Sequence, residues 1–211
     1  MADVVELRAA WTRHVGNGPS ELAVLDDVVA RHREPQRRYH GVHHVTWVIR
    51  HVHDLAAEVA VRDLGAVIVA AFFHDAVYDP RASDNEACSA RVAARALTGL
   101  GWDGGRTLAV TAMIQATAKH EWSADGDTAV LLDADLAVLG AEPSPYVAYV
   151  TGVRAEYAHL DAASWRDGRR HVLERLLSAD PLFATEPGRR RWAARARANL
   201  TAELATLAAP T

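Results

Sequence analysis

The chain has 211 residues, of which 50% are hydrophobic and 24% charged, with a formal net charge of −4 and a single cysteine. This balance is ordinary for a globular protein and gives no reason to expect nucleic-acid binding, and one cysteine excludes an intrachain disulfide. The longest apolar run is far shorter than the roughly 20 residues that cross a bilayer, so we expect a cytoplasmic protein with no membrane segment.

Apolar residues recur at helical spacing along nearly the whole chain, and strand-like alternation is scarce. This pattern predicts an all-α bundle of roughly nine helices, and the length suits a single domain over residues 1–211. The predicted helices lie at about 20–29, 41–62, 64–77, 83–99, 105–119, 129–139, 143–157, 164–177 and 187–207.

Several polar residues are expected at the starts of these helices. Ser20 and Ser164 are predicted N-caps, because their hydroxyl groups can accept a bond from a free backbone N–H. The segment Ser83–Glu86 has the spacing of a capping box. Asp127 or Thr128 is expected to begin the short helix at 129–139.

The helix predicted at 64–77 is apolar all round until it reaches His74 and Asp75. An imidazole and a carboxylate at the edge of a core are costly to desolvate unless a partner compensates for the lost water. A divalent metal ion is such a partner, so this pair is the first indication of a metal site.

Other polar residues stand at core-like positions before and after this pair. His40 and His44 are spaced one helical turn apart and should share a face. Adjacent residues on a helix diverge by about 100°, so His74 and Asp75 reach one ion only if their helix presents its edge to it.

Two aspartates follow in the very apolar stretch at 129–139. Asp133 and Asp135 point to nearly opposite sides of a helix, so at most one of them should face the site directly.

The order of these residues resembles that of the HD superfamily of metal-dependent phosphohydrolases, which is named for a His-Asp doublet, and most of all its predicted bacterial phosphohydrolases. The resemblance implies a compact multi-helix bundle of the HD-domain type, with a metal-site core at about 34–140 and C-terminal helices at 145–207 packing on it. The matching segments follow one another over most of the chain: Glu34–His44, Phe73–Pro80, Asp84–Ala90, Leu132–Gly140 and Ala196–Leu200.

By this resemblance the metal ligands are His44, His74, Asp75 and Asp135. The last of these is preferred to Asp133 because Ala-Asp-Leu at 134–136 resembles the segment that carries the last ligand of cyclic-nucleotide phosphodiesterases.

The resemblance also suggests further roles. Tyr39–His44 is similar to the Tyr-His-Asn-x-x-His segment of those phosphodiesterases, in which the first histidine is the general acid, so His40 is the expected acid. Gly41 stands where those enzymes have asparagine. His120 fits the position of an additional ligand in HD enzymes that bind two metals.

The ligand types indicate the chemistry. Imidazole and carboxylate together suit one or two ions of Mn²⁺, Fe²⁺, Co²⁺, Ni²⁺ or Zn²⁺, and Mg²⁺ also fits. Such an ion lowers the pKa of bound water from 15.7 to about 7. Arg37, one turn before His40, is expected to bind phosphate with its fork, and Lys119 to act as a point charge.

Two acidic residues keep two interpretations each. Glu86 is explained by the capping box, or it is catalytic, as HD nucleotidases that use a nearby acidic residue suggest. Asp133 either orients a ligand histidine or lies at the flank of its helix.

We therefore expect an enzyme, a metal-dependent phosphohydrolase that uses metal-activated water on a phosphoester of a nucleotide or similar small molecule. Two alternatives stay open: a di-iron HD-type oxygenase, and a catalytically inactive HD protein that binds a nucleotide or regulates a partner. A homodimer is a further expectation.

Overall fold

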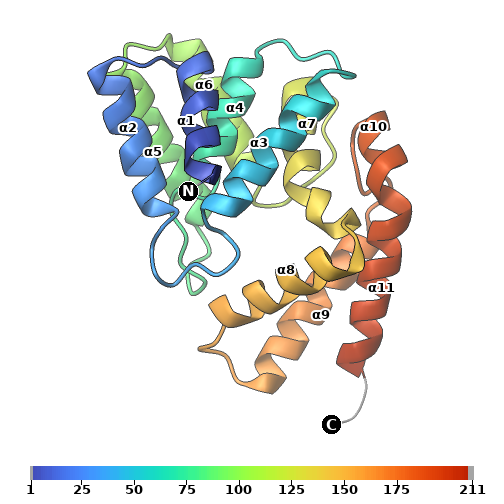
Figure 1. Cartoon of the computed structure of the whole chain (residues 1–211). Helices are drawn as coiled ribbons and strands as arrows, with labels where there is room; N and C mark the ends of the chain where they lie inside the picture. Colours follow the sequence, from blue (N-terminus) through green and yellow to red (C-terminus); the bar gives the residue numbers. More distant parts are fainter. Residues whose placement is uncertain (1, 209–211) are drawn as a thin grey trace.

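The computed structural model describes residues 2–208, and that part of the chain contains helices and connecting loops without a strand, which confirms the predicted all-α class (Figure 1). The elements are α1 (Ala2–His14), α2 (Pro19–Arg31), α3 (Val42–Ala56), α4 (Leu64–Phe73), α5 (Asn85–Gly99), α6 (Gly104–Ala116), α7 (Gly126–Leu136), the 3₁₀ turn η1 (Ala137–Gly140), α8 (Pro143–Glu156), α9 (Ala162–Ser178), α10 (Glu186–Gly188), the π-helical turn η2 (Arg189–Ala193) and α11 (Ala194–Ala208).

Helix α4 forms the centre of the first group of helices. Every residue from Ala66 to Phe73 is buried. Helices α1, α3, α5, α6 and α7 pack around it, which explains why its sequence is apolar on all sides. No helix within residues 2–208 is both long enough and apolar enough to span a membrane.

Helix α1 was not among the predicted helices. Leu7, Ala10 and Trp11 are its buried residues, and their spacing of three and four is the helical signal that the sequence does contain. The Trp11 ring packs edge-on against Phe72 of α4, with ring centroids 5.0 Å apart.

Helices α3 and α4 end earlier than predicted, at Ala56 rather than residue 62 and at Phe73 rather than residue 77. After Phe73, side chains from elsewhere in the chain form hydrogen bonds with backbone groups that a continued helix would have paired. The Arg37 guanidinium donates to the carbonyl oxygens of Asp75 and Ala76, and the Ser89 hydroxyl accepts from the Val77 N–H. This segment therefore leaves the helix and becomes a loop.

The predicted helix starts need correction. Asp125 and Asp161 are the N-caps of α7 and α9, and their carboxylates accept from the N–H groups of Thr128 and Ser164. Ser164 is thus a donor to the cap and not the cap itself. The N-cap of α2 is Gly18, with Pro19 in place of the expected Ser20 at the start.

The capping box predicted at Ser83–Glu86 does not form. The N-cap of α5 is Asp84, and its side chain accepts no bond from a backbone N–H at the start of the helix. Glu86 therefore has no capping role in the structure.

Helices α8, α9 and α11 form a second group, drawn in orange and red in Figure 1, which the chain reaches through η1. A buried ion pair joins two of these helices. Arg169 of α9 donates to both carboxylate oxygens of Glu203 of α11, at 2.7 and 3.0 Å, and Tyr146 of α8 donates to the same carboxylate at 2.6 Å. This shared contact fixes the three helices relative to one another.

Candidate metal centre

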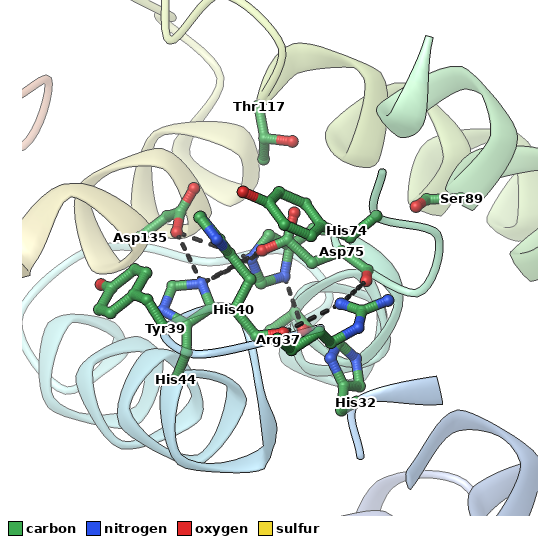
Figure 2. A network of polar contacts seen from close by, with 12 residues as sticks. His32, Arg37, Tyr39, His40, His44, His74, Asp75, Ser89, Thr117 and Asp135 are labelled. Carbon is green, nitrogen blue, oxygen red and sulfur yellow. Dashed lines mark hydrogen bonds and ion pairs between the residues drawn. The ribbon is translucent and has the colours of Figure 1, made fainter. Parts of the chain in front are cut away.

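Four predicted ligands come from three separate elements and meet at one point. His44 lies in the first turn of α3, His74 and Asp75 directly follow α4, and Asp135 is the penultimate residue of α7. Figure 2 shows their side chains converging, and the Nε2 atoms of the two histidines lie 3.0 Å apart.

Both carboxylates contact both imidazoles. Asp75 Oδ2 lies 3.4 Å from His44 Nε2 and 3.2 Å from His74 Nε2. Asp135 Oδ1 lies 3.2 Å and 3.6 Å from the same two nitrogens. His44, His74 and Asp75 offer ligand atoms that all lie within 4.8 Å of one another, so this group could hold a metal ion, with Asp135 beside it.

The early end of α4 explains how two adjacent residues reach the same point. On a continuous helix, His74 and Asp75 would diverge by about 100°. In the structure His74 is the C-cap of α4 and Asp75 lies beyond it. The direction of the Asp75 side chain is therefore not set by the helix, and it can turn toward His74.

The donor set fits a divalent transition metal. His74 Nδ1 donates to the Ala71 carbonyl oxygen at 2.9 Å, so the neutral ring presents an Nε2 lone pair to the centre. The 3.0 Å between the two Nε2 atoms is also the separation expected of two ligands about 2.1 Å from one ion at a right angle. Within residues 2–208, the buried His44 Nδ1 has no hydrogen-bond partner.

The electrostatics of the four groups are strongly coupled. Burial opposes charge on each of them, yet the pKa values of Asp75 and Asp135 lie well below the usual range and those of His44 and His74 are raised. The cause is that each carboxylate faces both imidazoles. The cluster therefore requires positive charge at its centre, which protons or a metal cation can supply.

A pocket of about 540 Å³ opens onto this cluster. Asp75, Asp135, His40 and His120 line its floor. A second set of lining residues, which we call the α8–α9 wall, comprises Tyr149, Val153 and Tyr157 from α8 and its end and Trp165, Gly168 and Arg169 from α9.

The predicted acid, His40, precedes α3 and has a partner that the sequence did not reveal. His40 Nδ1 lies 2.7 Å from Oε2 of Glu156, the last residue of α8. Tyr78 donates its hydroxyl to the same oxygen at 3.0 Å and stacks on the His40 ring at 4.3 Å. The imidazole is thus held in one orientation from two sides.

Glu156 is held as an anion despite its burial. Its Oε1 accepts the backbone N–H groups of Arg38, Tyr39 and His40 at 2.7, 2.8 and 3.0 Å. Burial favours the neutral acid, but the bonds from His40 and these N–H groups outweigh it and lower the pKa of Glu156 to about 2.

His120 contacts the cluster from its edge. Its Nε2 lies 2.8 Å from Asp135 Oδ2, the oxygen that does not face the other two histidines. Its φ angle is +51°, a left-handed conformation that costs a non-glycine residue roughly 1–2 kcal/mol. The structure therefore places His120 on a ligand carboxylate, and its role as an additional metal ligand stays a prediction.

The two predicted phosphate-binding cations are placed outside the pocket. Arg37 donates to the carbonyl oxygens of His40, Asp75 and Ala76 and to Glu34, so it clamps two loops behind the cluster (Figure 2). The Lys119 ammonium is largely exposed and lies in a neighbouring hollow.

The two acidic residues with open interpretations are now placed. Glu86 lines the pocket, which leaves its catalytic role as a prediction. Asp133 points away from the cluster and accepts from the N–H groups of Ala184 and Thr185 and from the Thr185 hydroxyl. A Cβ on Gly188 would overlap its carboxylate, so Asp133 anchors the approach to α10.

Comparison of the chain with protein-family models, with curated proteins and with solved structures finds no match.

Proposed function

We propose that the protein is a metal-dependent phosphohydrolase of the HD type that acts on a phosphoester of a nucleotide or a similar small molecule. The observation that carries the proposal is the convergence of two imidazoles and two carboxylates at the floor of an open pocket. The cluster needs positive charge, and beside it lies His40, whose imidazole contacts the carboxylate of Glu156. Both features suit phosphoester hydrolysis.

His44, His74, Asp75 and Asp135 would hold the ion. A divalent cation there would supply positive charge to a phosphoryl oxygen and acidify water at neutral pH. Both carboxylates also neutralise that charge, which favours a divalent ion over a monovalent one.

His40 is the proton donor for the leaving oxygen. Glu156 accepts from its Nδ1, so the protonated ring keeps one N–H for the pocket, which His40 lines. Glu156 stabilises the positive ring before transfer, and Tyr78 keeps the ring from rotating. Glu156 is a positioning residue in this scheme, because it acts through His40.

The di-iron alternative has one supporting contact. Asp135 places Oδ1 near His44 and His74 and Oδ2 near His120, so Asp135 and His120 would be the residues to hold a second ion. Two irons per chain together with oxygen consumption would replace the hydrolase proposal.

The test compares two neighbouring histidines, one buried in the cluster and one exposed. Protein purified without added metal is supplied with Mn²⁺, its metal content is measured, and phosphate release is screened over nucleotides. For His44→Ala we expect loss of bound metal and a loss of activity greater than about 100-fold, since even the partners of metal ligands are worth 10–100-fold.

The matched control is His43→Ala, whose side chain is 74% exposed and whose activity and metal content should stay at the wild-type level. Full turnover by His44→Ala on a substrate that the wild type hydrolyses would contradict the proposal.

A further inference from the structure

The α8–α9 wall differs from the floor in what it offers a ligand. Tyr149, Val153 and Tyr157 recur every four residues, and Trp165, Gly168 and Arg169 recur at spacings of three and four, so each helix presents one face to the pocket. Three of these six residues are aromatic. A phosphoryl group at the floor needs none of them.

Arg169 is the only lysine or arginine among the described residues that line the pocket. Its side chain is 5% exposed. Two of its N–H groups bond Glu203, and a third donates to the Tyr149 hydroxyl at 3.1 Å. A guanidinium has five N–H donors, so one on each terminal nitrogen has no partner within residues 2–208.

The charge of Arg169 argues against a role in holding the reacting phosphate. Its neighbour Tyr149 packs against Tyr39 with ring centroids 4.8 Å apart, and Tyr39 packs against His44 at 4.9 Å. Glu203 already balances the charge of the guanidinium. The free N–H groups therefore suit an uncharged acceptor, such as a carbonyl oxygen, better than a second anion.

Gly168 keeps the neighbouring space open. It is exposed, and a Cβ built on it would meet no atom within 4 Å. A larger side chain here would occupy pocket volume beside Trp165 and Arg169 without displacing the helix.

We propose that the α8–α9 wall binds the part of the substrate that does not react, a planar ring that carries a carbonyl group. Trp165 and Tyr157 supply the aromatic surface, with ring centroids 5.8 Å apart, and Arg169 donates to the carbonyl. The pocket volume lies within the range of about 300–1,000 Å³ of sites for small organic ligands. This inference rests on the proposed function for the phosphate end of the substrate.

The experiment measures dissociation constants by calorimetry in the presence of Mn²⁺ for four probes. Guanosine and uridine 5′-monophosphates have bases with a ring carbonyl, adenosine 5′-monophosphate has a base without one, and ribose 5-phosphate has no base. We expect guanosine or uridine monophosphate to bind about tenfold more tightly than adenosine monophosphate, the ratio that one hydrogen bond to a charged donor provides. All three should bind more tightly than ribose 5-phosphate.

Two variants locate the effect. Gly168→Leu should weaken the binding of the nucleotides about tenfold and leave the binding of ribose 5-phosphate unchanged. The control is Gly104→Leu, which also replaces an exposed glycine with open space around it but lies away from the pocket, and it should change neither affinity. Arg169→Met combined with Glu203→Leu removes the ion pair without leaving one charge buried, and should abolish the preference over adenosine monophosphate.

Equal binding of the nucleotides and ribose 5-phosphate by the wild type would overturn the inference, as would a preference for adenosine monophosphate. Phosphate release is followed in parallel. Ring-dependent binding without phosphate release would contradict the proposed hydrolysis and leave the wall assignment standing. If phosphate were released from both ribose 5-phosphate and the nucleotides, and both bound with equal affinity, the proposed hydrolysis would stand and the wall assignment would be contradicted.

Discussion

The floor of the pocket and the α8–α9 wall differ in the interactions that they offer a ligand. The floor brings ionisable groups from three elements within 3.0–3.6 Å of one another inside an apolar core. The wall presents aromatic rings and one guanidinium whose charge is already balanced. The floor therefore suits the proposed hydrolysis, and the wall suits the proposed binding of the rest of the substrate. Glu156 joins them, because it is the last residue of α8 and its carboxylate bonds His40.

The largest expected effect comes from replacing Glu156. Glu156→Gln places an amide where a carboxylate accepts from His40 and Tyr78, so the protonated imidazole loses its counter-charge. We expect kcat to fall about 10²–10⁴-fold, the range of general acid catalysis, with bound metal unchanged. Steady-state kinetics, a pH–rate profile and elemental analysis measure this.

The limb of the pH–rate profile that reports the acid should be lost in Glu156→Gln, which a purely structural defect would not cause. Glu142→Gln, at the exposed start of the same helix, is the control. Turnover by Glu156→Gln within about twofold of wild type would remove Glu156 from the mechanism.

The next prediction separates two aspartates on α7 that differ by two positions. Asp133→Ala leaves the N–H groups of Ala184 and Thr185 and a hydroxyl without their acceptor, so the free energy of unfolding should fall by about 1–3 kcal/mol. Its kcat and metal content should not change, because it belongs to neither floor nor wall.

Asp135→Ala is the matched variant and should lose metal. Urea denaturation and elemental analysis compare the two. If Asp133→Ala lost metal while keeping its stability, the assignment of the two carboxylates would be reversed.

A third prediction concerns pH. The folded state lowers the pKa of Glu156 from 4.5 to about 2, so between these values the unfolded chain binds more protons. The stabilisation from Glu156 is thus present above pH 4.5 and is lost as the pH falls toward 2, by up to about 1.4 kcal/mol per pH unit.

Urea denaturation at several pH values between 5 and 3 checks this. The difference in unfolding free energy between wild type and Glu156→Gln should shrink as the pH falls. A constant difference would mean that folding does not lower the pKa of the Glu156 carboxyl.

The smallest expected effect is at the outer surface, where Glu58 pairs with Arg190 and Arg191 of η2. All three side chains are partly exposed, so Glu58→Ala should cost less than about 1 kcal/mol and even less in 1 M salt. Kinetics should be unaffected. A loss larger than about 1 kcal/mol in denaturation experiments would show that this contact contributes more than an ordinary surface ion pair.

The sequence predicted the floor better than the wall, for a physical reason. Ionisable residues inside apolar runs, such as His74 and Asp135, stand out because burial there is costly without a partner. Glu156 and Arg169 lie on ordinary amphipathic helices where charged residues are common, so only their contacts across the fold distinguish them.

Arg37 shows a different limit of sequence reasoning. Its position one helical turn before His40 led to the prediction that it binds phosphate, but residues 32–41 form turns and α3 begins only at Val42. Helical spacing carries no information outside a helix, and here the guanidinium turned toward backbone carbonyls. The all-α class was predictable because periodicity over the whole chain does not depend on any single boundary.

The hydrogen bonds between Glu156 and residues 38–40 have a consequence for the order of folding. If only the first 140 residues had folded, all four candidate metal ligands would be in place, but Glu156 would not yet hold the His40 ring. The docking of α8 would then be the step that fixes the orientation of the His40 ring.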